Sequence, residues 1–177
     1  LMRADNDEPA ITVRPNLHRL RMAVFDEALR AEGHESAPGL NGGPVRVVAA
    51  GYVPSRSQLF RQGMLWLQDE AESIVPLLLG ARPGMRVLDY CAAPGGKAAA
   101  LAEAVAPNGL IVAMERHASR ARSMRENLAE RLRMPRVAVV CADGLRPPFA
   151  APFDAVLVDA PCSGLGVLRR RADARWR

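Results

Sequence analysis

Short apolar runs alternate with helix-forming stretches along the second half of this 177-residue sequence, and each apolar run leads into a polar loop. The runs lie at residues 86–89, 110–114, 137–141 and 154–159, and helices are expected at about 96–105 and 118–132. Alternating strands and helices with short connections are typical of a parallel sheet flanked by helices. We therefore predict an α/β fold whose ligand site lies at the carboxyl ends of the strands.

The most unusual loop is Asp89-Tyr-Cys-Ala-Ala-Pro-Gly-Gly-Lys97, which follows the first of these strands and precedes an Ala/Leu-rich helix. Gly95 and Gly96 have no Cβ, so the backbone can turn sharply and its N–H groups can approach a ligand closely. Lys97 is the only lysine among 24 cationic side chains. A retained ammonium indicates that a compact point charge matters here, and a chance position for one lysine is the alternative.

Acidic residues follow the predicted strands one after another, as Asp89, Glu115, Asp143 and Asp159. Glu115 lies 20 residues after Gly95, the spacing at which a nucleotide-binding αβ unit places an acid on a ribose diol. Asp143 is positioned to accept a hydrogen bond from an adenine amino group. A helix N-cap would explain any one of these acids, but four in succession beside one glycine loop favour a ligand.

The loop lacks the Gly-x-Gly-x-x-Gly spacing of dinucleotide sites, which makes an NAD-dependent oxidoreductase a weak candidate. A ligand with adenine, ribose and a charged amino-acid tail fits better, and that ligand is S-adenosylmethionine. A second loop, Asp159-Ala-Pro-Cys-Ser-Gly164, follows the last strand. Its cysteine indicates chemistry, and from the residues alone Cys162 would be the nucleophile.

The first third of the chain has a different pattern. A strand at 11–14, a helix at 20–31, a loop at 36–44 and strands at 45–48 and 64–67 predict part of a small α+β domain over residues 1–67. A helix that opens at Asp69 and Glu70 and contains Pro76 begins the second domain, residues 68–177.

Charge and cysteine content restrict the class of protein. Residues 1–80 carry a net charge of −2 and residues 81–177 a net charge of +7. A basic catalytic half fits a polyanionic substrate. The alternative explanation for the positive charge is that arginines, as at 116–136, cover solvent-exposed helix faces. Three cysteines with no zinc-like spacing predict a reduced, cytoplasmic protein without a metal. Cys141 is expected in a buried strand as a small core residue, and no apolar run is long enough for a membrane span.

The two loops resemble the signature motifs of the Nop/Sun-type RNA cytosine-5 methyltransferases. The tail Gly166-Val-Leu-Arg-Arg-Arg-Ala-Asp-Ala-Arg-Trp-Arg177 is similar to the segment that follows in the bacterial small-subunit ribosomal RNA methyltransferase B group. Gln68-Asp69-Glu70-Ala71 resembles the lead-in to the catalytic domain, and Pro9-Ala-Ile-Thr-Val-Arg14-Pro-Asn16 resembles the Arg-x-Asn strand of the preceding RNA-binding domain. The resemblance covers nearly the whole chain.

The resemblance implies a Rossmann-like methyltransferase that uses S-adenosylmethionine to methylate position 5 of cytosine in RNA, with ribosomal RNA as the expected partner. The cofactor-binding positions are then Asp89, Cys91, Ala92, Ala93, Pro94, Gly95, Gly96, Lys97, Glu115, Asp143 and Asp159. Asp159 is also expected to contact the target cytosine. Phosphate contacts are expected from Arg169, Arg170, Arg171, Arg175 and Arg177 beside the second loop.

The resemblance also changes the expected role of Cys162. In this family the nucleophile is a second cysteine, in a Thr-Cys motif about fifty residues further on, and the Pro-Cys residue assists release of the product. The 177 residues contain no such motif, so we expect a fragment of a longer enzyme, with an incomplete sheet, that is inactive alone and monomeric. The rival hypothesis is a non-catalytic RNA- or cofactor-binding module.

Overall fold

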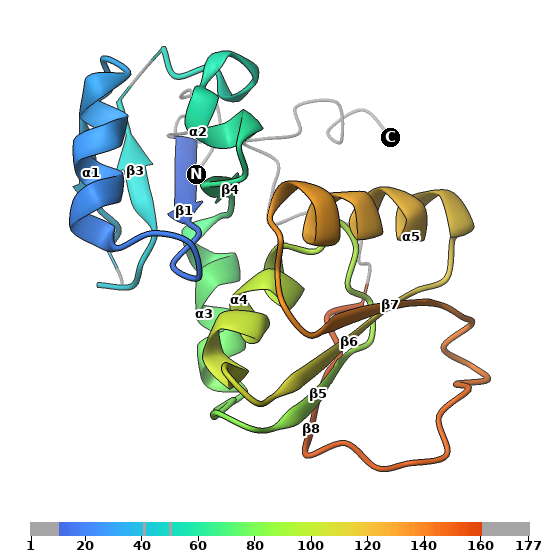
Figure 1. Ribbon diagram of the computed structural model, residues 1–177. Helices are drawn as coiled ribbons and strands as arrows, with labels where there is room; N and C mark the ends of the chain where they lie inside the picture. The colour runs from blue at the N-terminus through green and yellow to red at the C-terminus, as the bar shows by residue number, and fades with distance from the viewer. Residues whose placement is uncertain (1–10, 41, 50, 161–177) are drawn as a thin grey trace, which may run out of the picture.

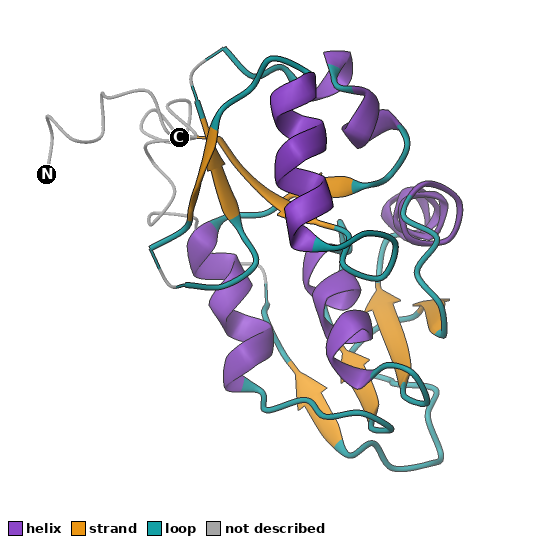
Figure 2. Ribbon diagram, turned by 60° about the vertical axis from the view of Figure 1, so that its left-hand side comes forward, coloured by secondary structure: helices purple, strands orange, loops and turns teal. Residues whose placement is uncertain are grey.

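The computed structural model describes residues 11–40, 42–49 and 51–160, which form two sheets with helices between them. Figure 2 shows the strands in two groups that are separated by helices. The first group is antiparallel and the second is parallel. The parallel group confirms the predicted α/β class for the second half of the chain.

The first sheet contains β1 (Ile11–Pro15), β2 (Ser36–Pro38), β3 (Arg46–Val48) and β4 (Leu65–Leu67), in the order β2-β3-β1-β4. Helix α1 (Met22–Ala31) packs on it through Phe25 and Leu29, which are fully buried with Val13 and Leu65. A 3-10 turn (Pro54–Arg56) and the short helix α2 (Gln58–Arg61) precede β4. This sheet therefore has an apolar core of its own.

The second sheet contains β5 (Arg86–Asp89), β6 (Leu110–Glu115), β7 (Val137–Cys141) and β8 (Ala155–Leu157), in the order β7-β6-β5-β8. Asp89 pairs in register with Ala113 and Leu157, and Glu115 pairs with Cys141. All three pairings are parallel, so the four strands end at the same edge of the sheet.

Three helices cover one face of the parallel sheet (Figure 1): α3 (Glu70–Leu78), α4 (Gly96–Val105) and α5 (Ala118–Arg125). Asp69 caps α3, because its side chain accepts the Ala71 N–H at 2.7 Å. Helix α4 buries a row of alanines from Ala98 to Ala100, and small side chains let it lie close to both sheets. Helix α5 continues as a π-helix over Glu126–Arg131.

Several local expectations were wrong. Part of the predicted loop at 36–44 forms β2, and neither the 3-10 turn nor α2 was predicted. Cys141 is exposed because β7 is at the edge of the sheet, so it is not a core residue. Within the described residues, no helix has the length and apolar character needed to span a membrane.

Candidate active site

The four acidic residues predicted from the sequence lie at one edge of the parallel sheet. Asp89 ends β5, Glu115 ends β6, and Asp143 and Asp159 each follow the end of a strand by two residues. Hydrogen bonds between the loops extend the sheet beyond its strands: the Tyr90 N–H donates to Leu157 O at 2.9 Å, and the Ala92 N–H donates to Met114 O at 2.9 Å. The first residues of the glycine loop are therefore fixed to both neighbouring strands.

The glycine loop ends in a sharp turn at Gly95, whose φ is 105°. A Cβ at this position would lie 3.2 Å from side-chain atoms of Met124 and Leu128, so both conformation and packing favour glycine. Helix α4 begins at Gly96, and its first hydrogen bond, from Ala99 N–H to Gly95 O, measures 2.9 Å. The N–H groups of the preceding helical residues have no partner within the helix, and such groups favour an anionic ligand group.

Asp89 is fully buried, and neither of its carboxylate oxygens has a hydrogen-bond partner among the described residues. Burial raises the pKa of this carboxyl group to about 7, although the Lys97 ammonium lowers it; the Asp159 carboxylate adds to the rise. The Cys91 N–H also lowers the pKa without forming a hydrogen bond of good geometry. A buried carboxylate without a partner is a candidate acceptor for a ligand ammonium or hydroxyl group.

Lys97 joins two elements that are far apart in the sequence. Its ammonium lies 2.9 Å from Asp159 Oδ2 and 3.1 Å from Glu72 Oε1 on α3, and its side chain is only 16% exposed. Burial by itself would lower the pKa of Lys97, but the hydrogen bond to Asp159 and the charge of Glu72 raise it above its ordinary value. Lys97 is therefore a fixed cation that holds the Asp159 carboxylate beside the glycine loop.

Glu115 and Asp143 also make local hydrogen bonds. Glu115 is buried, accepts the His117 N–H at 2.8 Å and lies 3.4 Å from the Arg120 guanidinium. Asp143 is more exposed and accepts the Leu145 N–H at 3.0 Å. The helix-cap explanation thus has some support at Glu115, since His117 directly precedes α5. The two carboxylates nevertheless lie on adjacent strand ends, where one extended ligand can reach both.

The two described cysteines differ in exposure, and neither is set up as a strong nucleophile. Cys91 is half-buried in the glycine loop, and burial raises the pKa of its thiol, as do the Asp89, Glu115 and Asp159 carboxylates. It is therefore protonated at neutral pH. Cys141 is exposed, and its sulfur lies 3.6 Å from Arg116 O. Cys162 and the arginines Arg169, Arg170, Arg171, Arg175 and Arg177 lie outside the described residues.

The rest of the loop lines two pockets on either side of Pro94, which is exposed, whereas Ala92 is buried. A pocket of about 420 Å³ lies against Ala93, Pro94 and α5. A second pocket, of about 240 Å³, lies between β4 of the first sheet and the glycine loop and helices that cover the second sheet, and Lys97 lines it. We call it the joint pocket; its lining residues are Phe60, Trp66, Leu67, Glu72, Pro94, Gly96, Lys97, Asn127 and Arg131.

Sequence patterns did not point to most walls of the joint pocket. Phe60 belongs to the unpredicted helix α2, and the sequence indicates Trp66 only as part of a strand. Arg131 belongs by its spacing to a basic helix face, although it is half-buried and donates to Phe60 O at 2.9 Å and to Leu65 O at 3.0 Å. Glu72 lies just after the Asp69-Glu70 helix start, and nothing local marks it as a partner of Lys97.

Comparisons with known proteins agree with this arrangement. Residues 76–177 match the profile of a family described as 16S rRNA methyltransferase RsmB/F. Ribosomal RNA small subunit methyltransferase B of Pasteurella multocida is 34% identical over 99% of this chain, and the protein of the same name from Pseudomonas putida is 37% identical over 97%. The chain spans 40% of the length of each of these two curated relatives.

The fold has a counterpart among solved structures. A methyltransferase homolog protein from Pyrococcus horikoshii matches 97% of this chain with a TM-score of 0.82 and 25% sequence identity, and the match covers 56% of that chain. Both the antiparallel and the parallel sheet are therefore part of the shared architecture.

Proposed function

The chain belongs to the 16S rRNA methyltransferase RsmB/F family, and from this premise we propose that the whole protein transfers a methyl group from S-adenosylmethionine to position 5 of a cytosine in ribosomal RNA. The observation that carries the proposal is the edge of the parallel sheet, where Asp89, Glu115 and Asp143 adjoin a glycine loop and a helix N-terminus. Each of these groups would have one partner among the carboxylate, ammonium, ribose hydroxyl and adenine amino groups of that cofactor.

Each part of the cofactor has a partner in the proposed site. The N–H groups at the start of α4 would hold its carboxylate, and the buried Asp89 carboxylate would hold its ammonium. Glu115 would accept the ribose hydroxyls, and Asp143 the adenine amino group. Ala92, Ala93, Pro94, Gly95 and Gly96 would shape the loop around the ligand, with Cys91 as a neutral thiol. S-adenosylmethionine supplies an electrophilic methyl group when bound.

The chemistry on the RNA requires a thiolate, because carbon 5 of cytosine is a poor nucleophile. A cysteine sulfur would form a bond to carbon 6, and carbon 5 would then take the methyl group as its bond to the sulfonium breaks and S-adenosylhomocysteine leaves. A base removes the proton from carbon 5, and the carbon–sulfur bond breaks to release 5-methylcytosine. Asp159, whose carboxylate lies 2.9 Å from the Lys97 ammonium, would contact the cytosine.

We propose that the attacking sulfur belongs to a cysteine outside these 177 residues and that Cys162 assists the release step. Cys91 is protonated, and Cys141 lies on the edge strand β7, which β6 separates from β5 and its glycine loop, so neither is suited to attack. In the whole protein, Cys162→Ala should therefore accumulate a covalent protein–RNA adduct that is visible on a denaturing gel. If Cys162→Ala instead abolishes the adduct formed by the wild type, Cys162 is the nucleophile.

The two sheets would have different roles in the whole protein. We propose that residues 1–67 belong to an RNA-binding domain and residues 68–177 to the catalytic domain, because each sheet has its own buried core. The joint pocket lies between them and is lined by Lys97, so RNA bound there would lie next to Lys97 and the Asp159 carboxylate that it holds. The basic residues from Arg169 to Arg177 would add phosphate contacts.

A labelled-methyl assay tests the proposed function. The whole protein is incubated with S-adenosylmethionine that carries a labelled methyl group and with 16S ribosomal RNA, and the RNA is digested to nucleosides for mass spectrometry. The expected product is labelled 5-methylcytidine. Binding of cofactor and RNA without transfer would instead identify a binding module, and label on another nucleoside would reject the cytosine-5 assignment.

A further inference from the structure

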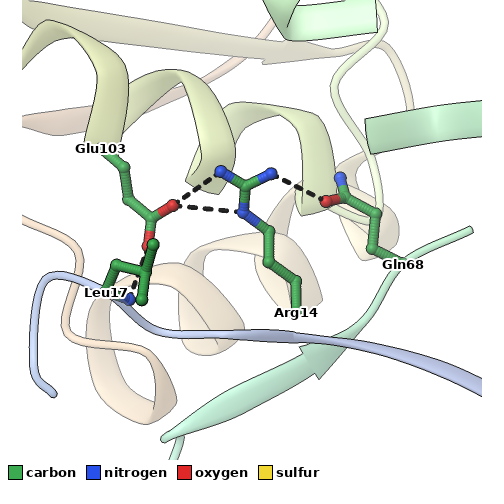
Figure 3. Close-up of polar contacts among 4 residues, drawn as sticks. All are labelled: Arg14, Leu17, Gln68 and Glu103. Atoms are coloured by element: carbon green, nitrogen blue, oxygen red, sulfur yellow. Dashed lines mark hydrogen bonds and ion pairs between the residues drawn. The ribbon is translucent and has the colours of Figure 1, made fainter. Parts of the chain in front are cut away.

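Arg14, on the strand that resembles the family's Arg-x-Asn strand, points into the protein. Its Nε and Nη2 atoms donate to Glu103 Oε2 on α4 at 3.1 and 2.9 Å, and its Nη1 atom donates to Gln68 Oε1 at 3.4 Å (Figure 3). The other carboxylate oxygen of Glu103 accepts the Leu17 N–H at 2.8 Å. The Arg14 guanidinium also lies 5.6 Å from the centre of the Trp66 ring. The Arg14 side chain is 8% exposed, and the atoms that donate to Glu103 and Gln68 are already engaged inside the protein, so it offers little surface to RNA.

Asn16, two residues further along, is completely buried and bridges the two sheets. Its Nδ2 atom donates to Gly63 O at 2.9 Å and to Leu132 O, beyond the π-helix, at 2.8 Å. Gly63 in turn lies against the backbone of Arg131, where a Cβ would lie 1.8 Å from the Arg131 oxygen. The two chain segments are thus in direct backbone contact.

Arg131 completes the contact from the opposite side. It donates to Phe60 O and Leu65 O, stacks over the Phe60 ring at 4.5 Å and is oriented by a 2.7 Å hydrogen bond to Asn127 Oδ1. Asn127 and Arg131 both belong to the π-helix, and both line the joint pocket. We call the set of Arg14, Asn16, Gly63, Glu103 and Arg131 the domain joint.

The domain joint fixes orientation more than it adds stability. Burial raises the pKa of Glu103 even though Arg14 lowers it, so the carboxylate loses more from leaving water than it gains from its partner. In some proteins, buried ion pairs of this kind select one geometry among several of similar stability. The geometry selected here sets the positions of Phe60 and Trp66 relative to Lys97 across the joint pocket.

We propose that Arg14 and Asn16 are positioning residues: they hold the first sheet against the catalytic domain and so set the width of the joint pocket, and they do not contact RNA. The proposal rests on the proposed function only in taking the joint pocket as the place where RNA meets Lys97. The occupied donors and the burial of both side chains are independent of that function.

The matched control for Arg14 is Arg46. Its guanidinium donates two hydrogen bonds to the Asp26 carboxylate, at 2.9 and 3.1 Å, and this pair joins β3 to α1 without reaching the second sheet. In the whole protein, Arg14→Met and Glu103→Gln should each lower kcat about tenfold, and the double variant should be no worse than either single variant because the two residues act as one pair. Arg46→Met should stay within about twofold of the wild type, as its pair does not cross the joint. If Arg14 contacted RNA instead, Glu103→Gln would leave kcat unchanged. An unchanged kcat in Glu103→Gln would therefore overturn the proposal.

Two measurements that do not depend on turnover separate this proposal from the proposed function. The salt dependence of RNA binding should keep its slope in Arg14→Met, whereas a lost phosphate contact would reduce the slope by about 0.7–0.9. Amide hydrogen exchange should rise in β1 and β4 of Asn16→Ala and Arg14→Met and stay unchanged in β5 and β6. A reduced slope, or unchanged exchange in β1 and β4, would overturn the positioning role even if the protein methylates RNA.

Discussion

The glycine-loop edge and the domain joint contain the same kinds of residue but use them in opposite ways. At the edge, the Asp89 carboxylate is buried without a partner among the described residues, and α4 presents its first N–H groups. At the joint, the Arg14 and Asn16 side chains donate to carboxylate, amide and carbonyl oxygens inside the protein. Three neutral polar atoms near the joint, Asn16 Oδ1, Trp66 Nε1 and Gln68 Nε2, are also buried without a partner among the described residues. The difference is one of charge: a buried ionisable carboxyl group without a partner costs far more than a neutral group, and this marks the edge as the place for a ligand.

The largest effect is expected at Asp89. Because its carboxyl group is buried without a partner among the described residues, the stability of the protein should depend on pH. The pKa of Asp89 is about 7 in the folded protein and 3.8 in its unperturbed state. Between these values the folded protein retains a proton that the unfolded chain has lost, so the free energy of unfolding should fall as the pH rises from 4 to 7. The full loss is up to about 4 kcal/mol.

Urea unfolding of Asp89→Asn between pH 4 and pH 8 checks this expectation. The variant should lose most of the fall in stability between pH 4 and pH 7, because an amide does not titrate. Glu27→Gln, at an exposed position of α1, is the control and should keep the wild-type profile. If the free energy of unfolding changes in the same way from pH 4 to pH 7 in the wild type and in Asp89→Asn, Asp89 does not titrate as expected. That result would show that its carboxylate has a partner.

The second effect tests the domain joint. Gly63 has a φ of 70° and no space for a Cβ next to the Arg131 oxygen, so Gly63→Ala should lower the free energy of unfolding by about 3 kcal/mol. Gly33 has a φ of 84°, but a Cβ there would meet no other atom within 4 Å. Gly33→Ala should therefore cost only about 1 kcal/mol, from backbone conformation alone. Equal losses in chemical denaturation would mean that the joint accommodates the extra atom.

The parts of the fold that were predictable are those set by local sequence. Strands β5 to β8 and helix α4 follow from apolar runs and the glycine turn, and the meeting of their acidic ends follows from parallel strand direction. Cys141 was misjudged because an apolar run does not reveal whether its strand is central or at an edge.

The domain joint was not predictable for a different reason. Arg14 and Glu103 are 89 residues apart in the chain, and Asn16 and Leu132 are 116 apart. Neither pair has a local pattern that indicates contact, and family resemblance assigned the strand to RNA binding. Arg131 reaches Phe60 O and Leu65 O from a π-helix, which the helical spacing of the sequence did not indicate.

The third effect concerns ligand affinity at the edge. Glu115→Ala should weaken binding of S-adenosylhomocysteine by about 1–3 kcal/mol, because the ribose diol would lose a charged acceptor. Glu115→Gln keeps an oxygen for the His117 N–H and should lose less, while Glu130→Ala, at an exposed position of the π-helix, should bind like the wild type. Calorimetry of the three variants tests this role. An unchanged affinity in Glu115→Ala would mean that Glu115 only caps α5.

The contrast between edge and joint is tested most directly by amide hydrogen exchange of the whole protein with and without S-adenosylhomocysteine. We expect slower exchange on ligand binding at residues 89–97, 115–117 and 142–146, which lie at the carboxyl ends of β5, β6 and β7. Residues 11–16 and 63–68 of the domain joint should exchange at the same rate in both samples. Protection confined to the joint, or no protection at the three strand ends of a protein that is folded, would contradict the assignment of the sheet edge as the cofactor site.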